Sequence, residues 1–357
     1  MRRRGRRGLV LIAAGCAGLA ACSSAGPPSG SPPSSNTPTP SSAGIIRFAT
    51  PPASQGCAGA KRAAAGTATI PVTVSHRQGQ VAAMANVCIN GKGPFPFLID
   101  TGAQGSIVTT SLARKVGLRA IGQPLEIGGA DCTAEAHSSQ ITKWNVAGLV
   151  LQPEIVTYLN VPLFGQKGQP DGVIGSDVWS RFGAMRLDFR RDLITVPGPE
   201  RGAPARETVI GGPTAQPVPS SLLHGRADVT VPMRVDLQPD GTGITIQVKL
   251  GTHPPADFTP DTGASQSAID SGVARQFGLR PLRAHVRQST VCTVATLPEV
   301  ESGAWSVAGH QLRPQPLGST GLEATTGLAG LLGADQMSLF GSVIFDYSGG
   351  RLILGAG

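Results

Sequence analysis

A repeated stretch in the chain constrains its fold more than any other feature. Residues 100–119 match residues 261–280 without a gap, at a constant offset of 161 positions, and both copies begin Asp-Thr-Gly-Ala and end Gly-Leu-Arg. Further along, residues 172–183 match residues 330–341, and both segments contain two apolar residues followed by Gly. Ordered self-similarity of this kind indicates that one structural unit occurs twice.

Single residues between these segments also correspond. Cys132 matches Cys292, and Trp144 matches Trp305. Because the matches keep the same order in both halves, we expect two similar lobes. The predicted boundaries are residues 67–198 for the first lobe, 199–224 for a Pro- and Gly-rich linker, and 225–357 for the second lobe.

The composition favours an all-β fold. Only 15% of the residues are charged and 4% are aromatic, while 48 are Gly, and short Val-, Ile- and Leu-rich runs recur between turn residues. We expect strands at Val81–Ile89 and Phe95–Ile99, joined by a turn at Asn90–Gly91, and further strands at Val146–Val150 and Glu154–Leu159. The predicted closing hairpins are residues 185–189 with 193–196, and residues 343–347 with 351–354.

Short helices complete each predicted lobe. Ser111–Val116 has a helical pattern that Gly117 would end. Residues 176–182 form a second helical pattern, with Ser176 or Asp177 in position to cap its start and Gly183 to end it.

Several other matched residues have ordinary structural interpretations. Asp335 corresponds to the capping position of the second lobe, so we interpret it as a helix cap. Asp188 and Asp346 precede hairpin turns and favour turn formation. Trp144 and Trp305 are expected to pack in the core.

The first residues form a targeting signal. A cluster of Arg precedes the apolar stretch Leu9–Ala21, which is too short to span a bilayer comfortably. Residues 19–22 resemble the lipobox of bacterial lipoproteins, which implies that residues 1–21 are removed and that the Cys22 thiol is lipidated. The resemblance implies an exported protein on the outer face of the cytoplasmic membrane, and the Arg pairs are compatible with general secretory or twin-arginine export.

A polar segment follows the predicted anchor. Residues 22–66 are dominated by Ser, Pro, Thr and Gly at their start, so we expect a disordered tether there. Residues 45–75 are less polar, and an inhibitory role for them stays open. The net charge of +8 falls to +3 without the five leader Arg. The sequence contains no basic stripe with interleaved aromatics, so nucleic-acid binding has little support.

Four cysteines lie after the predicted anchor, and an even number is typical of an exported protein with disulfides. An even number of them permits two disulfides, and the spacing leaves all three pairings open. No Cys-x-x-Cys or His-Glu-x-x-His motif points to a metal, and we expect no metal and no cofactor. The four cysteines are Cys57, Cys88, Cys132 and Cys292.

An apolar strand leading into Asp-Thr-Gly, with two apolar residues and a Gly further along, resembles the pepsin and retropepsin class of aspartic peptidases. The residues that carry the resemblance are Asp100, Thr101, Gly102, Val173, Ile174 and Gly175 in the first half, and Asp261, Thr262, Gly263, Leu331, Leu332 and Gly333 in the second. The resemblance covers residues 80–198 and 228–357. It implies a two-lobed acid-protease fold in which each lobe is a retropepsin-like β-barrel with short helices, related by internal duplication.

The chemistry of this class needs two carboxyls. Asp100 and Asp261 would share one proton, so that one acts as base on a water while the other acts as acid. The resemblance therefore implies an aspartic endopeptidase acting on peptide or protein substrates, as a monomer. An inactive lipoprotein that keeps the peptide-binding cleft is the alternative.

Other residues of the motif would support this pair. In the family, the Thr hydroxyl reaches the backbone of the opposite lobe, a role that falls to Thr101 and Thr262. Gly102 and Gly263 would allow the two loops to approach closely. The residues expected to pack beneath the loops are Val173, Ile174, Gly175, Leu331, Leu332 and Gly333.

Three features of the sequence go beyond the family motif. Ala103 and Ala264 lack the hydroxyl found after Gly in many pepsin-like enzymes, which predicts a mildly acidic activity optimum. Pro260 precedes the second Asp and predicts an irregular strand there. Cys132 and Cys292 fall where the family places its flap hairpins, and we hypothesise a disulfide between the flaps, the alternatives being pairing within each lobe or free thiols.

Overall fold

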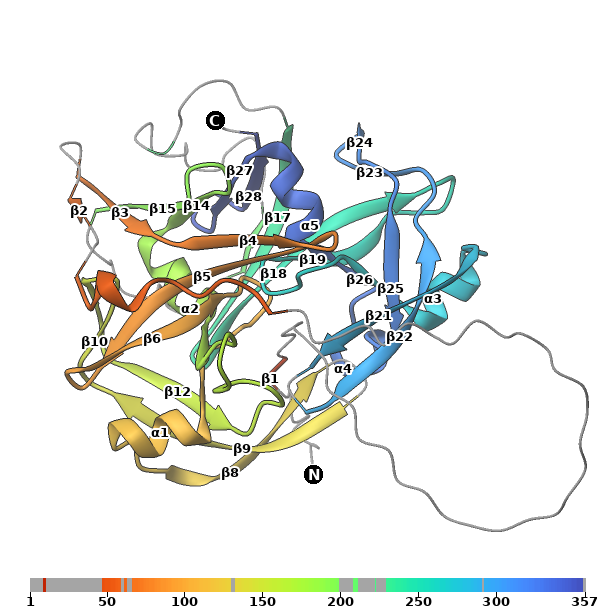
Figure 1. Cartoon of the computed structure of the whole chain (residues 1–357). Helices are drawn as coiled ribbons and strands as arrows, with labels where there is room; N and C mark the ends of the chain where they lie inside the picture. The colour runs from red at the N-terminus through yellow and green to blue at the C-terminus, as the bar shows by residue number, and fades with distance from the viewer. Residues whose placement is uncertain are drawn as a thin grey trace, which may run out of the picture.

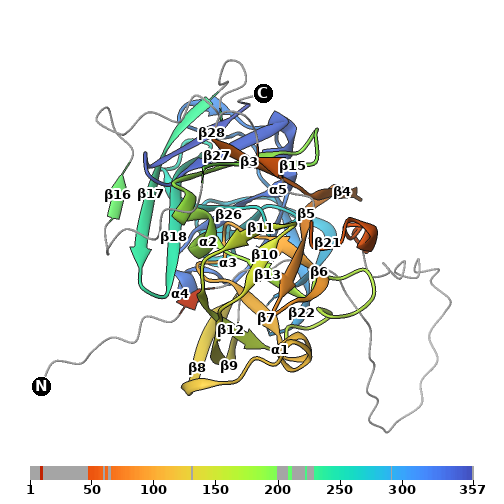
Figure 2. The same ribbon diagram turned by 90° about the vertical axis from the view of Figure 1, so that its left-hand side faces the viewer.

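The computed structural model describes residues 9–10, 47–58, 61–62, 66–129, 132–198, 208–210, 222, 229–290 and 292–355. These residues form two β-rich lobes side by side (Figures 1 and 2). Cys22 and most of the predicted signal peptide, tether and linker lie outside the described residues. Within the described part of the chain, no helix is both long and apolar enough to cross a membrane.

The first lobe is built on one sheet of 11 strands. Near its centre, β13 lies parallel to β6 and antiparallel to β7. The strand that leads to Asp100, β6, therefore lies between β13 and β5. The strands are β1 (Leu9–Val10), β4 (Thr73–Arg77), β5 (Gln80–Ile89), β6 (Lys92–Ile99), β7 (Ile107–Thr109), β8 (Ile121–Gly129), β9 (Cys132–Ile141), β10 (Trp144–Val146), β11 (Leu149–Leu151), β12 (Glu154–Leu159) and β13 (Gly172–Ile174).

The second lobe repeats this arrangement. Here β26 lies parallel to β19 and antiparallel to β20, as β13 does to β6 and β7. Its strands are β16 (Thr208–Ile210), β17 (Val229–Gln238), β18 (Gly241–Leu250), β19 (Ala256–Asp261), β20 (Ala268–Asp270), β21 (Pro281–Ser289), β22 (Val294–Glu301), β23 (Trp305–Val307), β24 (His310–Gln311), β25 (Pro316–Thr320) and β26 (Gly330–Gly333). The predicted all-β duplication is confirmed.

A third set of strands joins the lobes, and we call it the floor sheet. The closing hairpins of the two halves pair through β14 and β27, with Arg186 opposite Ile344 at the middle of the contact. β3 extends this sheet on one side and β17 on the other. The additional strands are β2 (Lys61–Arg62), β3 (Thr67–Pro71), β14 (Ala184–Asp188), β15 (Leu193–Pro197), β27 (Ser342–Asp346) and β28 (Arg351–Leu354).

The helices are short. Thr109 Oγ1 accepts a hydrogen bond from Leu112 N at 3.1 Å at the start of α1, and Gly117 ends this helix at φ 81°, as predicted. Asp270 caps α3 in the corresponding place. The helices are η1 (Ala53–Gln55), α1 (Thr110–Val116), α2 (Ser176–Trp179), η2 (Ser180–Phe182), α3 (Ser271–Gln276), α4 (Glu323–Thr326), α5 (Ala334–Met337) and η4 (Ser338–Phe340).

Turn residues decide where several strands end. Asn90 and Gly91 both have positive φ, which confirms the predicted tight hairpin turn between β5 and β6. The predicted strand Val146–Val150 is wrong, because Ala147 and Gly148 adopt φ 48° and 97° and turn the chain between β10 and β11. The apolar run 146–150 therefore contains a tight turn that its composition does not indicate.

Asp188 and Asp346 stabilise the turns of the closing hairpins, as predicted. Asp188 Oδ1 accepts hydrogen bonds from the backbone N–H groups of Arg190 and Arg191, at 3.1 and 3.0 Å. Asp346 Oδ1 accepts one from Gly349 N at 2.8 Å. Each carboxylate thus accepts hydrogen bonds from turn N–H groups that have no backbone acceptor in the turn.

The irregular strand predicted at Pro260 is not found. β19 runs unbroken from Ala256 to Asp261, and Pro260 pairs with Leu332 of β26. The fixed φ of proline is compatible with an extended strand, and only its missing N–H distinguishes it from the Ile99 of the first lobe.

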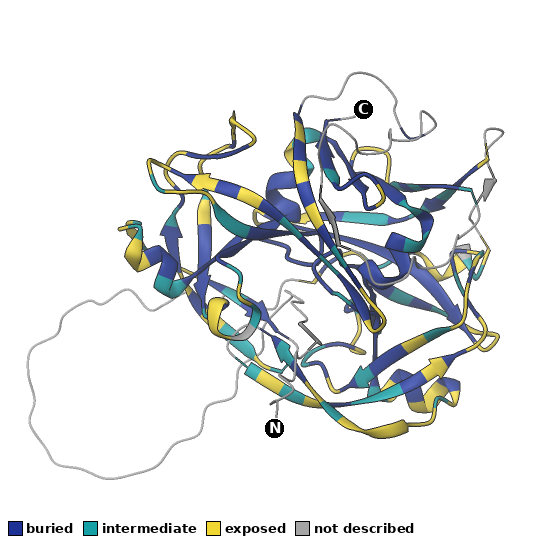
Figure 3. Cartoon of the chain, turned by 180° about the vertical axis from the view of Figure 1, so that it is seen from behind, coloured by how far each residue is buried: buried dark blue, intermediate teal, exposed yellow. Residues whose placement is uncertain are grey.

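The core runs through both lobes. Figure 3 shows buried residues along the central strands and exposed residues at outer helices and turns. Trp144 and Trp305 are 3% and 1% exposed, which confirms their predicted packing. Their indole N–H groups donate to the carbonyls of Gln152 and Arg313, at 2.7 and 2.8 Å, so neither buried donor is left unpaired.

Residues 47–58 lie against the first lobe, although they fall within the predicted tether. Phe48 is buried, Ala49 N donates to Ser75 Oγ at 2.8 Å, and a disulfide joins Cys57 to Cys88 of β5. The apolar side chain and the disulfide hold this segment on the first lobe.

The floor sheet predicts that the two lobes stay together when the linker is cut. We would insert a site for a sequence-specific protease between Gly202 and Ala203, in a Cys132→Ser/Cys292→Ser background that removes the covalent tie. After cleavage, size-exclusion chromatography should show both fragments eluting together at the volume of the uncut protein. Separation of the fragments under native conditions would contradict this.

Candidate active site

The two Asp-Thr-Gly loops meet between the lobes. Asp100 follows β6 and Asp261 ends β19, so each sits at the tip of a central strand of its own lobe. Neither aspartate exposes any surface to solvent. The duplicated sequence therefore produces two buried carboxyls facing each other across the lobe boundary.

The Thr hydroxyls lock the loops together. Thr101 Oγ1 donates to the carbonyl of Pro260 at 2.7 Å, and Thr262 Oγ1 donates to the carbonyl of Ile99 at 2.8 Å. Each hydroxyl also accepts from the backbone N–H of the opposite Thr, at 3.1 Å in both directions. Pro260 takes part through its carbonyl, so its missing N–H does not disturb this exchange.

Gly102 and Gly263 permit the close approach of the loops. A Cβ on Gly102 would lie 2.3 Å from Cγ of Asp261, and a Cβ on Gly263 would lie 2.2 Å from Cγ of Asp100. These distances are too short for any side chain. Each glycine is thus packed against the carboxyl of the opposite loop.

Each carboxyl has one bonded and one free oxygen. Asp100 Oδ1 accepts from Ala103 N at 2.9 Å, and Asp261 Oδ1 accepts from Gly263 N and Ala264 N at 2.8 and 2.9 Å. The Oδ2 atoms of both aspartates are buried and make no hydrogen bond within the described part of the chain. Ala103 and Ala264 carry no hydroxyl that would serve these oxygens.

This environment raises the pKa values of both carboxyls. Burial raises the pKa of Asp100 well above its usual range, and the nearby charge of Asp261 raises it further. Burial also raises the pKa of Asp261, to about 6, against the opposing effect of the N–H groups of Ala264 and Gly263. The two protons therefore leave the pair at different pH values.

Apolar residues support each loop from below. Val173 packs in one cluster with Ala103, and Leu331 packs in another with Ala264. Ile174 and Leu332 face the main core instead. The glycines that follow allow tight packing, since a Cβ on Gly175 or Gly333 would lie 2.8 Å from the carbonyl of Ala103 or Ala264.

The predicted capping role of Asp177 and Asp335 is wrong. The N-caps of α2 and α5 are Gly175 and Gly333, which have no side chain to cap the helix. Asp177 instead accepts from the N–H and hydroxyl of Ser106, at 2.9 and 2.8 Å. A buried partner at the end of the active loop therefore competes successfully with the helix start.

The second lobe repeats this contact. Asp335 accepts from the N–H and hydroxyl of Ser267, at 3.0 and 2.8 Å. Burial raises the pKa of both Asp177 and Asp335 to about 6. The Ser–Asp pairs fasten the far end of each active loop to the helix that follows the apolar pair.

The active loops also contact the opposite lobe through equivalent backbone bonds. Val81 N donates to the carbonyl of Ser265 at 2.9 Å, and Thr242 N donates to the carbonyl of Gln104 at 2.8 Å. The loop of Asp261 therefore contacts β5, and the loop of Asp100 contacts β18.

One contact has no counterpart in the other half. Ser176 Oγ donates to the carbonyl of Thr101 at 2.8 Å and lies 2.9 Å from the hydroxyl of Tyr347, a buried residue of the second lobe. The corresponding residues of the other half are Ala334 and Phe189, which have no hydroxyl. The loop of Asp100 therefore has a polar support that the loop of Asp261 lacks.

The sequence analysis assigned no role to Ser106 or Ser267, and its suggestion that Ser176 caps α2 is wrong because Gly175 is the N-cap. Ser106 and Ser267 occupy the same place in the aligned repeat, six residues after each Asp, and this match was the available signal. The Ser176–Tyr347 pair left no such signal because it breaks the repeat. Among the described residues, no group of three or more His, Cys, Asp or Glu side chains could hold a metal ion.

Two hairpins extend from the lobes on the side of the flaps expected from the resemblance. The first flap is formed by β8 and β9, and the second flap by β21 and β22. A disulfide between Cys132 and Cys292 joins them, with a Cα–Cα distance of 6.3 Å. This pairing agrees with the hypothesised link between the flaps.

Comparison with known proteins agrees with this geometry. No curated protein matches the chain. The sequence model of the aspartyl protease family matches residues 85–178 and 246–336, which together make up more than half of the chain and contain both Asp-Thr-Gly loops. The chain belongs to the aspartyl protease family.

Proposed function

We propose that the protein is an aspartic endopeptidase that hydrolyses peptide bonds with a water activated between Asp100 and Asp261. The observation that carries this proposal is the pair of buried carboxyls, each with an Oδ2 atom that makes no hydrogen bond within the described residues. Membership of the aspartyl protease family supports a peptidase-type hydrolase in general.

The hydrogen bonds favour a division of roles between the two carboxyls. Asp261 Oδ1 accepts from two backbone N–H groups, whereas Asp100 Oδ1 accepts from Ala103 N. N–H donors stabilise the ionised form, so Asp261 is the base and Asp100 the acid in this proposal.

In the proposed reaction the ionised Asp261 takes a proton from the water as its oxygen forms a bond to the carbonyl carbon of the substrate. Asp100 donates its proton to the carbonyl oxygen, which gives a neutral tetrahedral intermediate. The proton held by Asp261 then passes to the leaving nitrogen, the C–N bond breaks, and Asp100 regains its proton from the collapsing intermediate. Both carboxyls return to their starting states.

The place of action follows from the leader of the sequence. Lipidation of Cys22 would anchor the protein to the outer face of the cytoplasmic membrane, and the polar residues after it would hold the two lobes away from the surface. The proposed substrates are therefore peptides or exported proteins, cleaved by a monomer whose two lobes complete one site.

Substitution of either aspartate tests the dyad. Asp100→Asn and Asp261→Asn should each lower kcat on an unfolded casein substrate by about 100- to 10,000-fold, because each removes the acid or the base. Asp192→Asn is the matched control, since Asp192 is exposed in the turn between β14 and β15 and an Asn there can still accept from Val74 N.

Two results of this assay would contradict the proposal. Turnover retained in either dyad variant would exclude the assigned chemistry. Absence of cleavage by the wild-type protein at every pH from 3 to 7 would favour a peptide-binding protein that has lost turnover.

The pKa values predict the pH dependence of kcat/KM. Below about pH 6 the pKa of Asp261 leaves both carboxyls protonated, so the base is lost. Asp100, whose pKa is also raised by burial, has to keep its proton, so the acid is lost where this carboxyl ionises. The profile should therefore rise through about pH 6 and fall at higher pH, and an optimum near pH 2, of the order seen for unperturbed coupled carboxyls, would contradict it.

The close contacts of Gly263 predict that no larger residue is tolerated at this position. Gly263→Ala should lower the free energy of unfolding by about 2 kcal/mol or more and abolish cleavage, because its Cβ would overlap the Asp100 carboxyl. Gly243→Ala is the control, since its Cβ would meet Gln104 at an ordinary 3.6 Å. Thermal unfolding and the casein assay measure both effects, and equal behaviour of the two variants would refute the close approach.

A further inference from the structure

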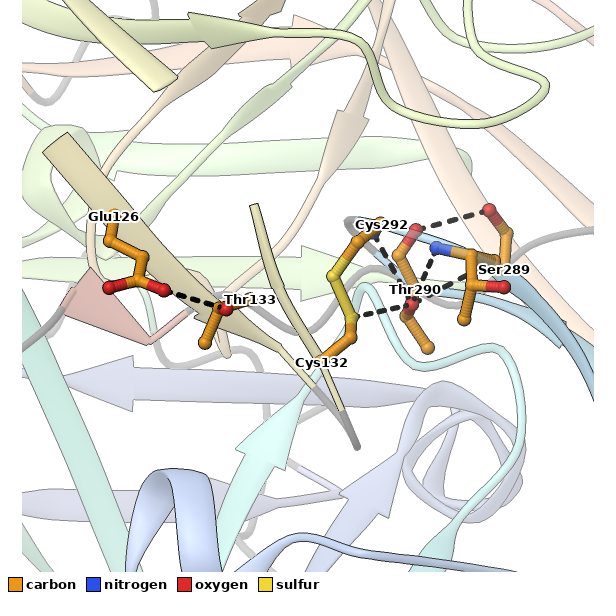
Figure 4. The surroundings of a disulfide bond; sticks show 7 residues. Glu126, Cys132, Thr133, Ser289, Thr290 and Cys292 are labelled. Atoms are coloured by element: carbon orange, nitrogen blue, oxygen red, sulfur yellow. Dashed lines mark hydrogen bonds between the residues drawn. A yellow bond between two sulfur atoms is a disulfide. The ribbon is translucent and has the colours of Figure 1, made fainter. Parts of the chain in front are cut away.

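The disulfide between Cys132 and Cys292 lies at the tips of the two flaps. In the first flap Gly129 pairs with Cys132, the last described pair before the turn. In the second flap Ser289 pairs with Val294, and Cys292 lies in the turn between them. The bond therefore joins the ends of two hairpins that start in different lobes (Figures 1 and 4).

Further contacts hold the second flap on the first lobe. Ser289 Oγ donates to the carbonyl of Pro162 at 3.0 Å. The hydroxyl of Thr290 lies 3.4 Å from Cys132 Sγ (Figure 4). Thr290 also accepts from Thr293 N at 3.1 Å, which orders the turn that carries Cys292. The tie is thus part of a packed junction between the lobes.

This junction lies over the loop of Asp100. Ile127 of the first flap is buried in the same apolar cluster as Ala103, and Cys132 and Cys292 pack against that cluster. The flaps in this position agree with the complete burial of both aspartates.

Together, the loops, the floor sheet and the tied flaps form a closed ring of connections between the two lobes. On one side the lobes are joined by the exchanged hydrogen bonds of Thr101 and Thr262 and by the floor sheet. On the other side they are joined by the flaps and the disulfide. Thermal motion can separate packed hairpins, but it does not break a covalent bond in the absence of a thiol.

We propose that this ring restricts the substrate to polypeptides with a free, unfolded end, which thread through it as a single extended chain. An extended strand needs a passage close to the 10 Å spacing of packed sheets, whereas a folded domain of about 100 residues has a radius of gyration near 13 Å. A flexible loop held between two folded domains cannot reach the dyad while the flaps are tied. This inference rests on the proposed peptidase function and names its substrate class.

Two substrates with the same unfolded peptide test the proposal. In one, a single folded domain is fused to the peptide and the other end is free. In the second, a folded domain blocks each end. For the wild-type protein kcat/KM should be at least about tenfold higher for the free-ended substrate, and for Cys132→Ser/Cys292→Ser the ratio should fall towards about one.

The second disulfide provides a matched control. Cys57→Ser/Cys88→Ser removes a disulfide within the first lobe and leaves the flaps tied. It should keep the wild-type ratio. Treating this control with dithiothreitol then opens the flap disulfide alone, and the ratio should fall as in the flap variant, which keeps the test usable if the flap variant does not fold.

The outcomes separate this inference from the proposed function. Cleavage of both substrates by the wild-type protein at similar kcat/KM would overturn threading and leave the peptidase intact. Absence of cleavage of either substrate, by every variant and after reduction, would overturn the peptidase function and threading with it. A ratio that falls equally in both disulfide variants would also overturn threading, because loss of stability alone would then explain it.

Discussion

The hydroxyls of Thr101 and Thr262 bind the backbone of the opposite loop, and the rest of the site depends on this exchange. The four hydrogen bonds are buried, where an unpaired carbonyl at Ile99 or Pro260 would be costly. They fix the distance between the loops. The glycines are then required because no side chain fits in the remaining space.

Close packing of the loops also determines their electrostatics. Asp100, Asp177, Asp261 and Asp335 are all buried near the lobe boundary, and burial raises the pKa of each. A carboxyl whose pKa is raised in the folded state contributes stability that is complete below its unfolded pKa and is lost as the pH rises through the folded value, here about 6 for three of them. The stabilising contribution of these four carboxyls is therefore complete only below their unfolded pKa values and is lost as the pH rises through their folded ones.

Local sequence signals predicted the parts of the molecule that local structure decides. The repeat placed one Asp-Thr-Gly loop in each lobe, and Asn90–Gly91 marked its hairpin turn. Pairing of β14 with β27 was not predictable, because strand partners far apart in sequence are chosen by the packing of whole lobes. Asp177 was misinterpreted because an Asp at a helix start looks the same whether it caps the helix or binds Ser106.

The Ser176–Tyr347 contact shows what a single chain gains over two identical subunits. In a symmetric dimer both carboxyls have the same surroundings, so neither is favoured to hold the shared proton. Here one half has Ser176 and Tyr347 where the other has Ala334 and Phe189, so the two halves can diverge one residue at a time. A single chain can therefore give its two carboxyls different surroundings, whereas two identical subunits cannot.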